Sequence, residues 1–94
     1  MWDTTVKNNK IIRWDEEKNK KLKKERGIGF EVIFSLIEDG LIADIRDNPN
    51  YSNQKYYFFV LHEYVYCVPV VETAEEIFLK TIFPSRKYTK LIKE

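Results

Sequence analysis

Positively charged side chains are concentrated at the two ends of this 94-residue sequence. Nine basic and five acidic residues give positions 1–26 a net charge of +4, and positions 80–94 also carry +4, whereas positions 27–79 carry −7. If the fold brings the two ends together, they form a surface for a polyanion such as RNA; the alternative is two solvated basic segments without a partner. The cations that we expect to contact RNA are Lys20, Lys21, Lys23, Lys24, Arg26, Lys87 and Lys90.

The other reactive residue types restrict the chemistry. Metal-free RNA cleavage needs a base, cations that stabilise the phosphate, and an acid, and two histidines can supply the base and the acid. The only histidine, His62, lies between two predicted strands and is interpreted as a turn residue. The only cysteine, Cys67, lies in an apolar run and is interpreted as a core residue. There is no Cys-x-x-Cys pair and no glycine-rich phosphate loop, so we expect neither a metal nor a cofactor.

Two helices are predicted in the first half of the chain. Asp15 is suited to cap the start of a lysine-rich helix that runs to about Arg26 and stops at Gly27. Apolar side chains at i, i+3, i+4 and i+7 predict a second helix, whose core-facing residues are Phe30, Ile33, Phe34 and Ile37. Gly40 ends this second helix. The first helix can bury only a narrow stripe, whereas the second belongs to the core.

Runs of alternating, β-branched and aromatic residues predict a sheet in the second half. The four runs are positions 41–46, 55–61, 65–71 and 77–83. The short connection between the second and third runs predicts a hairpin, and a short strand at 11–14 precedes the first helix. Ser85 can cap a short basic helix over 86–93. The predicted fold class is therefore α+β, with two helices packed on one face of a four-stranded antiparallel meander.

The length suits one domain, which we expect over residues 11–94 after a flexible N-terminal arm at 1–10. No apolar run is long enough to cross a bilayer, and the first residues lack the apolar stretch of a secretory signal. We therefore expect a cytoplasmic protein that makes no contact with a membrane.

The segment WDEEKNKKLKKERGIGFE resembles the opening signature of the BrnT family of RelE-like toxins. The residues that match at the family's spacing are Trp14, Asp15, Lys18, Gly27, Ile28, Phe30 and Glu31. The sequence departs from the family at Leu22, where Asn is favoured, and at Glu25 and Arg26, where Lys and His are favoured. Residues 82–86, IFPSR, are similar to the Ile-Ile-Ser-Ala-Arg stretch that closes the family's last strand.

This resemblance implies a RelE-type fold, metal-independent RNA cleavage that halts translation, and neutralisation by a cognate antitoxin. It also implies the site. Arg86 is expected to grip the phosphate and Lys80 to contact it from the strand. Lys55 occupies a strand start where the family often has a basic residue, and Tyr88 is expected to stack on a base or donate a proton. RNA preference, the need for a ribosome, and oligomerisation with itself or with the antitoxin stay open.

Two other functions stay open beside the toxin. Thr81 and Ile92 stand where the family has Arg and Glu, so a relative that keeps the fold without the chemistry would be a silent module that binds nucleic acid or protein. An interaction domain that uses an aromatic sheet face is the third hypothesis.

Overall fold

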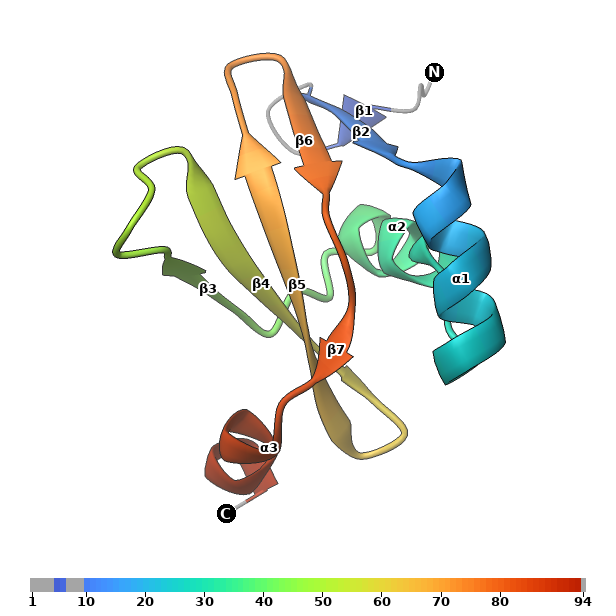
Figure 1. Ribbon diagram of the computed structural model, residues 1–94. Helices are drawn as coiled ribbons and strands as arrows, with labels where there is room; N and C mark the ends of the chain where they lie inside the picture. The colour runs from blue at the N-terminus through green and yellow to red at the C-terminus, as the bar shows by residue number, and fades with distance from the viewer. Residues whose placement is uncertain (1–4, 7–9, 94) are drawn as a thin grey trace.

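The structure, a computed structural model, describes residues 5–6 and 10–93 and is an α+β fold built on a mixed sheet (Figure 1). Its elements in chain order are β1 Thr5–Val6, β2 Lys10–Trp14, α1 Glu16–Arg26, α2 Phe30–Glu38, β3 Asp44–Asp47, β4 Gln54–Leu61, β5 Tyr64–Glu72, β6 Glu76–Leu79, β7 Phe83–Pro84 and α3 Arg86–Lys93. The strands lie in the order β1-β2-β6-β5-β4-β3, and β7 pairs with β5.

Both predicted N-terminal helices form, and the expected residues cap α1. The side chain of Asp15 accepts a hydrogen bond from the backbone N–H of Glu17 at 3.0 Å, and Gly27 ends α1 in the left-handed region at φ 72°. Left-handed backbone is costly for residues with a Cβ atom, which explains the glycine. In the predicted apolar stripe of α2, Phe30 and Ile33 are fully buried and Ile37 nearly so, whereas Phe34 is partly buried and packs against the core.

The predicted hairpin joins β4 to β5 through a tight turn. His62 and Glu63 both have positive φ, at 52° and 66°, and Leu61 pairs with Tyr64 across the turn. Two consecutive positive-φ residues are characteristic of a type I′ turn, whose twist matches that of the flanking strands. The interpretation of His62 as a turn residue is confirmed.

The sheet differs from the prediction because the N-terminal segment joins it. Strands β3 to β6 pair antiparallel in sequence order, but β2 adds to β6 in parallel, with Ile12 opposite Ile77 and Trp14 opposite Leu79. Within the predicted arm, Thr5–Val6 pairs with β2, and Lys10 is the first residue of β2. Residues 1–4 and 7–9 of that arm lie outside the described residues.

The predicted last strand, 77–83, is divided into β6 and β7. Val70 pairs with Leu79 and Cys67 pairs with Phe83, so the two residues of β5 between these pairs lie opposite three residues, 80–82. One extra residue in a strand leaves the regular ladder and bends the chain, as in a β-bulge. Ile82, in the bent segment, is fully buried.

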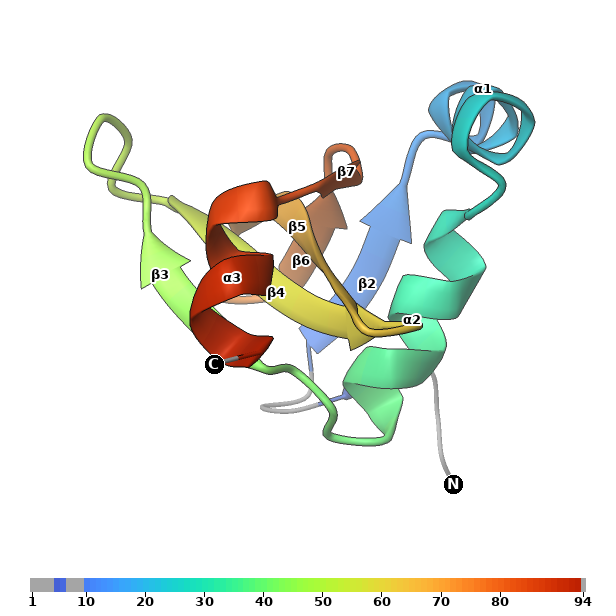
Figure 2. The same cartoon turned by 90° about the horizontal axis from the view of Figure 1, so that it is seen from below.

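The sheet has packed side chains on both faces. Alternate residues of β4, including Tyr57 and Phe59, belong to the core that α1 and α2 cover. Phe58, between them, packs with Val65, Cys67 and the ring of Tyr88 from α3. Because successive side chains of a strand point to opposite faces, α3 covers the face away from α1 and α2. Figures 1 and 2 both show α3 apart from the other two helices.

Among the described residues no helix combines the length and apolarity that crossing a bilayer requires.

Candidate functional site

Helix α3 is fixed to the edge of β5 by hydrogen bonds around one residue, Val65. The backbone N–H of Ser85 donates to the carbonyl oxygen of Val65 at 2.8 Å, and the N–H of Val65 donates to Thr89 Oγ1 at 2.9 Å. The Thr89 hydroxyl in turn donates to the Ser85 carbonyl at 2.7 Å. Ser85 Oγ accepts from the N–H of Tyr88 at 3.3 Å, which is the predicted helix cap. The basic C-terminal helix therefore has a defined position against the sheet.

An open groove of about 430 Å³ runs between this helix and the start of β5. Its lining residues are Tyr64, Arg86, Lys87, Thr89 and Lys90. The three cations among them are exposed; Arg86 was predicted as a catalytic residue, and Lys87 and Lys90 as RNA contacts. Among the described residues that line the groove none is acidic, so the charged side chains of its wall are all positive. Guanidinium and ammonium groups grouped in this way can hold the phosphates of a nucleic acid.

The sequence did not single out Tyr64 as a site residue. Its half-buried ring contacts that of Tyr66 edge-on, with the centroids 5.9 Å apart, and Tyr66 packs against the main core. The aromatic composition of β4 and β5 predicted core packing in general. Only the register of the hairpin and the docking of α3 place this tyrosine in a cationic groove.

Tyr88 supports the fold instead of lining the groove. Its ring is stacked on Phe58, with a centroid distance of 4.0 Å and an interplanar angle of 15°, and the Arg46 guanidinium carbon lies 5.4 Å from its centroid. Together these contacts fasten α3 to β3 and β4. The Arg46 side chain is also bonded to Asp44 at 2.9 Å, which raises the pKa of Arg46 above its ordinary value and lowers that of Asp44.

The structure does not bring Lys80 and Lys55 together with Arg86. The N–H of Lys80 donates to the carbonyl of Pro69, which is four residues along β5 from Val65, or about 13 Å in an extended strand. Lys55 lies on the face that α1 and α2 cover and forms an ion pair of 3.2 Å with Asp47. The four predicted catalytic residues therefore do not form one cluster.

The cations of α1 form a second basic surface, separate from α3. Lys20, Lys21, Lys23, Lys24 and Arg26 are all exposed. Lys23 forms an ion pair of 3.0 Å with Glu31. Figures 1 and 2 place α1 and α3 at different sides of the molecule. The two basic ends of the sequence consequently do not merge into one patch, because β2 and α1 are held against β6 and α2 while α3 is held against β5.

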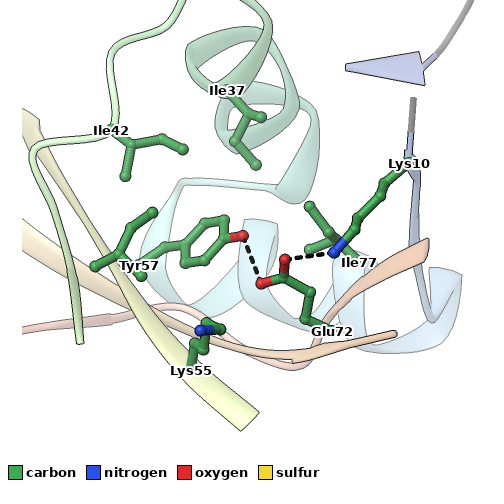
Figure 3. Close-up of a pocket in the computed structure, with 8 residues that line it drawn as sticks. Lys10, Ile37, Ile42, Lys55, Tyr57, Glu72 and Ile77 are labelled. Carbon is green, nitrogen blue, oxygen red and sulfur yellow. Dashed lines mark hydrogen bonds and ion pairs between the residues drawn. The ribbon is translucent and has the colours of Figure 1, made fainter. Parts of the chain in front are cut away.

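A small pocket lies on the helix-covered face, between α2 and the sheet (Figure 3). Glu72 lies at its centre. Its carboxylate accepts a hydrogen bond from the Tyr57 hydroxyl at 3.1 Å and forms an ion pair with Lys10 at 2.6 Å. Burial by itself raises the pKa of Glu72, but the hydrogen bonds from Lys10 and Tyr57 and the charge of Lys55 outweigh it and hold the pKa below its ordinary value. Burial, followed by the charge and hydrogen bond of Glu72, raises the pKa of Tyr57. Nothing in the sequence indicates this pocket, because its polar residues come from segments far apart in the chain.

The residues that carry the family resemblance have structural roles in the described part of the chain. Asp15 caps α1 and Gly27 ends it, while Phe30 lies in the core. Trp14 packs on Phe30 with a centroid distance of 5.8 Å. Glu31 accepts hydrogen bonds from Asn19 and Lys23. The motif therefore specifies the helical hairpin and supplies no reactive cluster.

Within residues 5–6 and 10–93, no group of three or more histidine, cysteine, aspartate or glutamate side chains is arranged to hold a metal ion. No protein-family model, curated protein or solved structure matches the chain.

Proposed function

We propose that this chain binds RNA in the groove of α3 and cleaves it as the toxin of a type II toxin-antitoxin pair of the BrnT type. The observation that carries the proposal is the grouping of Arg86, Lys87 and Lys90 with Tyr64 around one open groove. Grouped cations that neutralise successive phosphates are a common arrangement in proteins that bind single-stranded RNA.

In this proposal Arg86 has the main part in the chemistry. A guanidinium can bond two phosphate oxygens at once and stabilise the charge that develops on the phosphate as the 2′-oxygen bonds to phosphorus and the bond from phosphorus to the 5′-oxygen breaks. Water takes the proton of the 2′-hydroxyl and gives one to the leaving 5′-oxygen, and the product is a cyclic 2′,3′-phosphate. Lys87 and Lys90 hold the flanking phosphates. Cleavage by such a site depends on substrate alignment and charge stabilisation, with only modest proton transfer.

A toxin of this kind needs an inhibitor that keeps it inactive in the cell that makes it. The proposed inhibitor is an antitoxin that covers the groove. A small DNA-binding protein encoded in the neighbouring gene would fit this partner. The complex tests the surface directly: co-expression with the antitoxin should protect Lys87 and Lys90 from chemical acetylation, while Lys20 and Lys21 stay reactive.

The second candidate function is RNA binding without cleavage. It is favoured by the separation of Lys80 and Lys55 from Arg86 and by the stacking of Tyr88 on Phe58, which together leave Arg86 without the predicted catalytic neighbours. A module of this kind would keep the groove and lack the reaction.

Expression of the chain in bacterial cells separates the two. Growth and the integrity of total RNA are followed after induction of the wild type, Arg86→Ala and Arg13→Ala. Arg13→Ala is the control, because Arg13 is an exposed cation of β2 that forms an ion pair with Glu76 of β6. Growth arrest with RNA cleavage that only Arg86→Ala abolishes supports the toxin. Intact RNA and normal growth with the wild type overturn it.

Binding is measured separately, by titrating a single-stranded RNA at several salt concentrations. Three phosphate contacts in the groove predict that log K falls with log salt with a slope of about −2. Joint replacement of Arg86, Lys87 and Lys90 by alanine should remove that dependence. Joint replacement of the α1 cations shows whether α1 adds contacts, because each additional phosphate contact steepens the wild-type slope.

A further inference from the structure

The pocket around Glu72 has an apolar interior and a charged wall. Its volume is about 140 Å³, and four isoleucine side chains line it together with Lys10, Lys55, Tyr57 and Glu72. The isoleucines are Ile37, Ile42, Ile45 and Ile77. Figure 3 shows Ile37 and Ile42 across the pocket from Glu72, with Tyr57 and Lys10 on either side of the carboxylate. A ligand here would meet apolar contacts on one side and ionic contacts on the other.

The ionic side of this pocket favours an anion. Two lysines and one glutamate give the wall one excess positive charge. Both carboxylate oxygens of Glu72 already accept bonds, one from Tyr57 and one from Lys10. Lys55 is bonded to Asp47, whose side chain is 85% exposed, so that ion pair is weak and exchangeable. A single negative charge would balance the wall, whereas a dianion would place excess negative charge beside Glu72.

The size of the pocket limits the rest of the ligand. An apolar cavity of about 150 Å³ holds a molecule as large as benzene. The space therefore accepts a short aliphatic or small aromatic tail and excludes a nucleotide or a peptide segment. Branched isoleucine side chains are complementary to a compact, branched tail.

We propose that this pocket binds a small monocarboxylate with a short apolar tail, its carboxylate held by Lys55 and Lys10 and its tail by the isoleucines. The site lies on the sheet face opposite α3, so it goes beyond the proposed RNA-binding function and does not depend on it. It gives Lys55, which was expected to act on RNA, a ligand of a different class.

The test uses isovalerate, a branched short-chain carboxylate, added to the full chain while amide signals are followed by NMR at constant ionic strength. Shifts should be confined to the pocket, at residues such as Tyr57, Glu72 and Ile77, with a Kd of about 1 mM, as expected for a ligand of this size. Isovaleramide, which has the same shape without the charge, should bind at least tenfold more weakly. Equal binding of the two, or shifts confined to α3, would overturn the proposal.

Two variants locate the ligand. Lys55→Met keeps the length of the side chain and removes the charge, and it should weaken isovalerate binding about tenfold or more. Ile45→Trp, at a rim position that is 43% exposed, should fill the pocket and abolish binding without removing any charge. The dispersion of the amide spectrum shows in each case that the variant is folded. Wild-type affinity in both folded variants would show that isovalerate binds elsewhere.

Discussion

The side-chain oxygen of Asn19 accepts a hydrogen bond of 2.7 Å from the backbone N–H of Phe30, joining α1 to the first residue of α2. Asn19 is fully buried, and its amide donates to Glu16 at 3.1 Å and to Glu31 at 2.9 Å. The N–H of a first helical residue has no partner within its own helix, so this side chain satisfies a group that would otherwise be buried and unpaired. Asn19 thus joins the start of α2 to α1 through a buried hydrogen bond.

We expect Asn19→Ala to lower the free energy of unfolding by about 2 kcal/mol, because it leaves the buried N–H of Phe30 without an acceptor. The measurement is denaturation by guanidinium chloride, followed by circular dichroism. Lys20→Ala, an exposed neighbour on the same helix, is the control and should change stability by less than about 0.5 kcal/mol. Similar stability of the two variants would contradict this role of Asn19.

The Glu72 carboxylate is expected to stabilise the fold in a manner that depends on pH. Its pKa is lowered in the folded chain, so its contribution is present above the ordinary value of 4.5 and is lost as the pH falls through the lowered pKa. Glu72→Gln should therefore cost about 2 kcal/mol at pH 7, and this difference from the wild type should shrink steadily below pH 4.5. Unfolding by urea at a series of pH values measures it.

Glu75→Gln is the control for this series, because Glu75 is exposed in the turn before β6. Its difference from the wild type should be small at every pH. A Glu72→Gln difference that is the same at pH 3 and pH 7 would show that the charge of Glu72 does not contribute.

Tyr88 is expected to matter through its ring and not through its hydroxyl. Tyr88→Phe keeps the stacking on Phe58 and should change stability by less than about 0.5 kcal/mol, whereas Tyr88→Ala should cost about 2 kcal/mol and loosen α3. Thermal unfolding measures stability, and hydrogen exchange at the N–H of Val65, which bonds to Thr89 of α3, measures the docking. Equal losses in both variants would assign the effect to the hydroxyl.

Cys67 is expected to be unreactive while the chain is folded. The side chain is 3% exposed, and burial raises the pKa of its thiol to about 11 from an ordinary 9.0. The thiolate fraction at neutral pH is therefore about 100-fold lower than in the unfolded chain. A thiol reagent should modify Cys67 at least that much more slowly in buffer than in concentrated urea, and similar rates would contradict the burial.

Local features of the fold could be predicted because the interactions that create them span only a few residues. Asp15 caps α1 from two residues away, and Gly27 takes the left-handed conformation that ends the helix. The apolar spacing from Phe30 to Ile37 identified the buried face of α2. The short connection at His62 predicted the hairpin. In each case the chemistry of the neighbouring residues determines the backbone.

The sheet could not be predicted in the same way. The parallel pairing of β2 with β6 joins Ile12 to Ile77, and no local pattern in either strand specifies the other as its neighbour. The division of the last strand depends on one extra residue relative to β5, which appears only when the two strands are aligned. Pairing and register are chosen by the core as a whole.

The sequence by itself determined where the helices and the hairpin form, that Cys67 is buried, and that the chain's positive charge lies at its ends. The tertiary structure decided which of those charges act together. It brought Arg86 beside Tyr64, placed Lys55 on the opposite face, and kept α1 apart from α3. Strands present alternate residues to opposite faces, so a shift of one position or a helix docked on the other side moves a side chain into a different site.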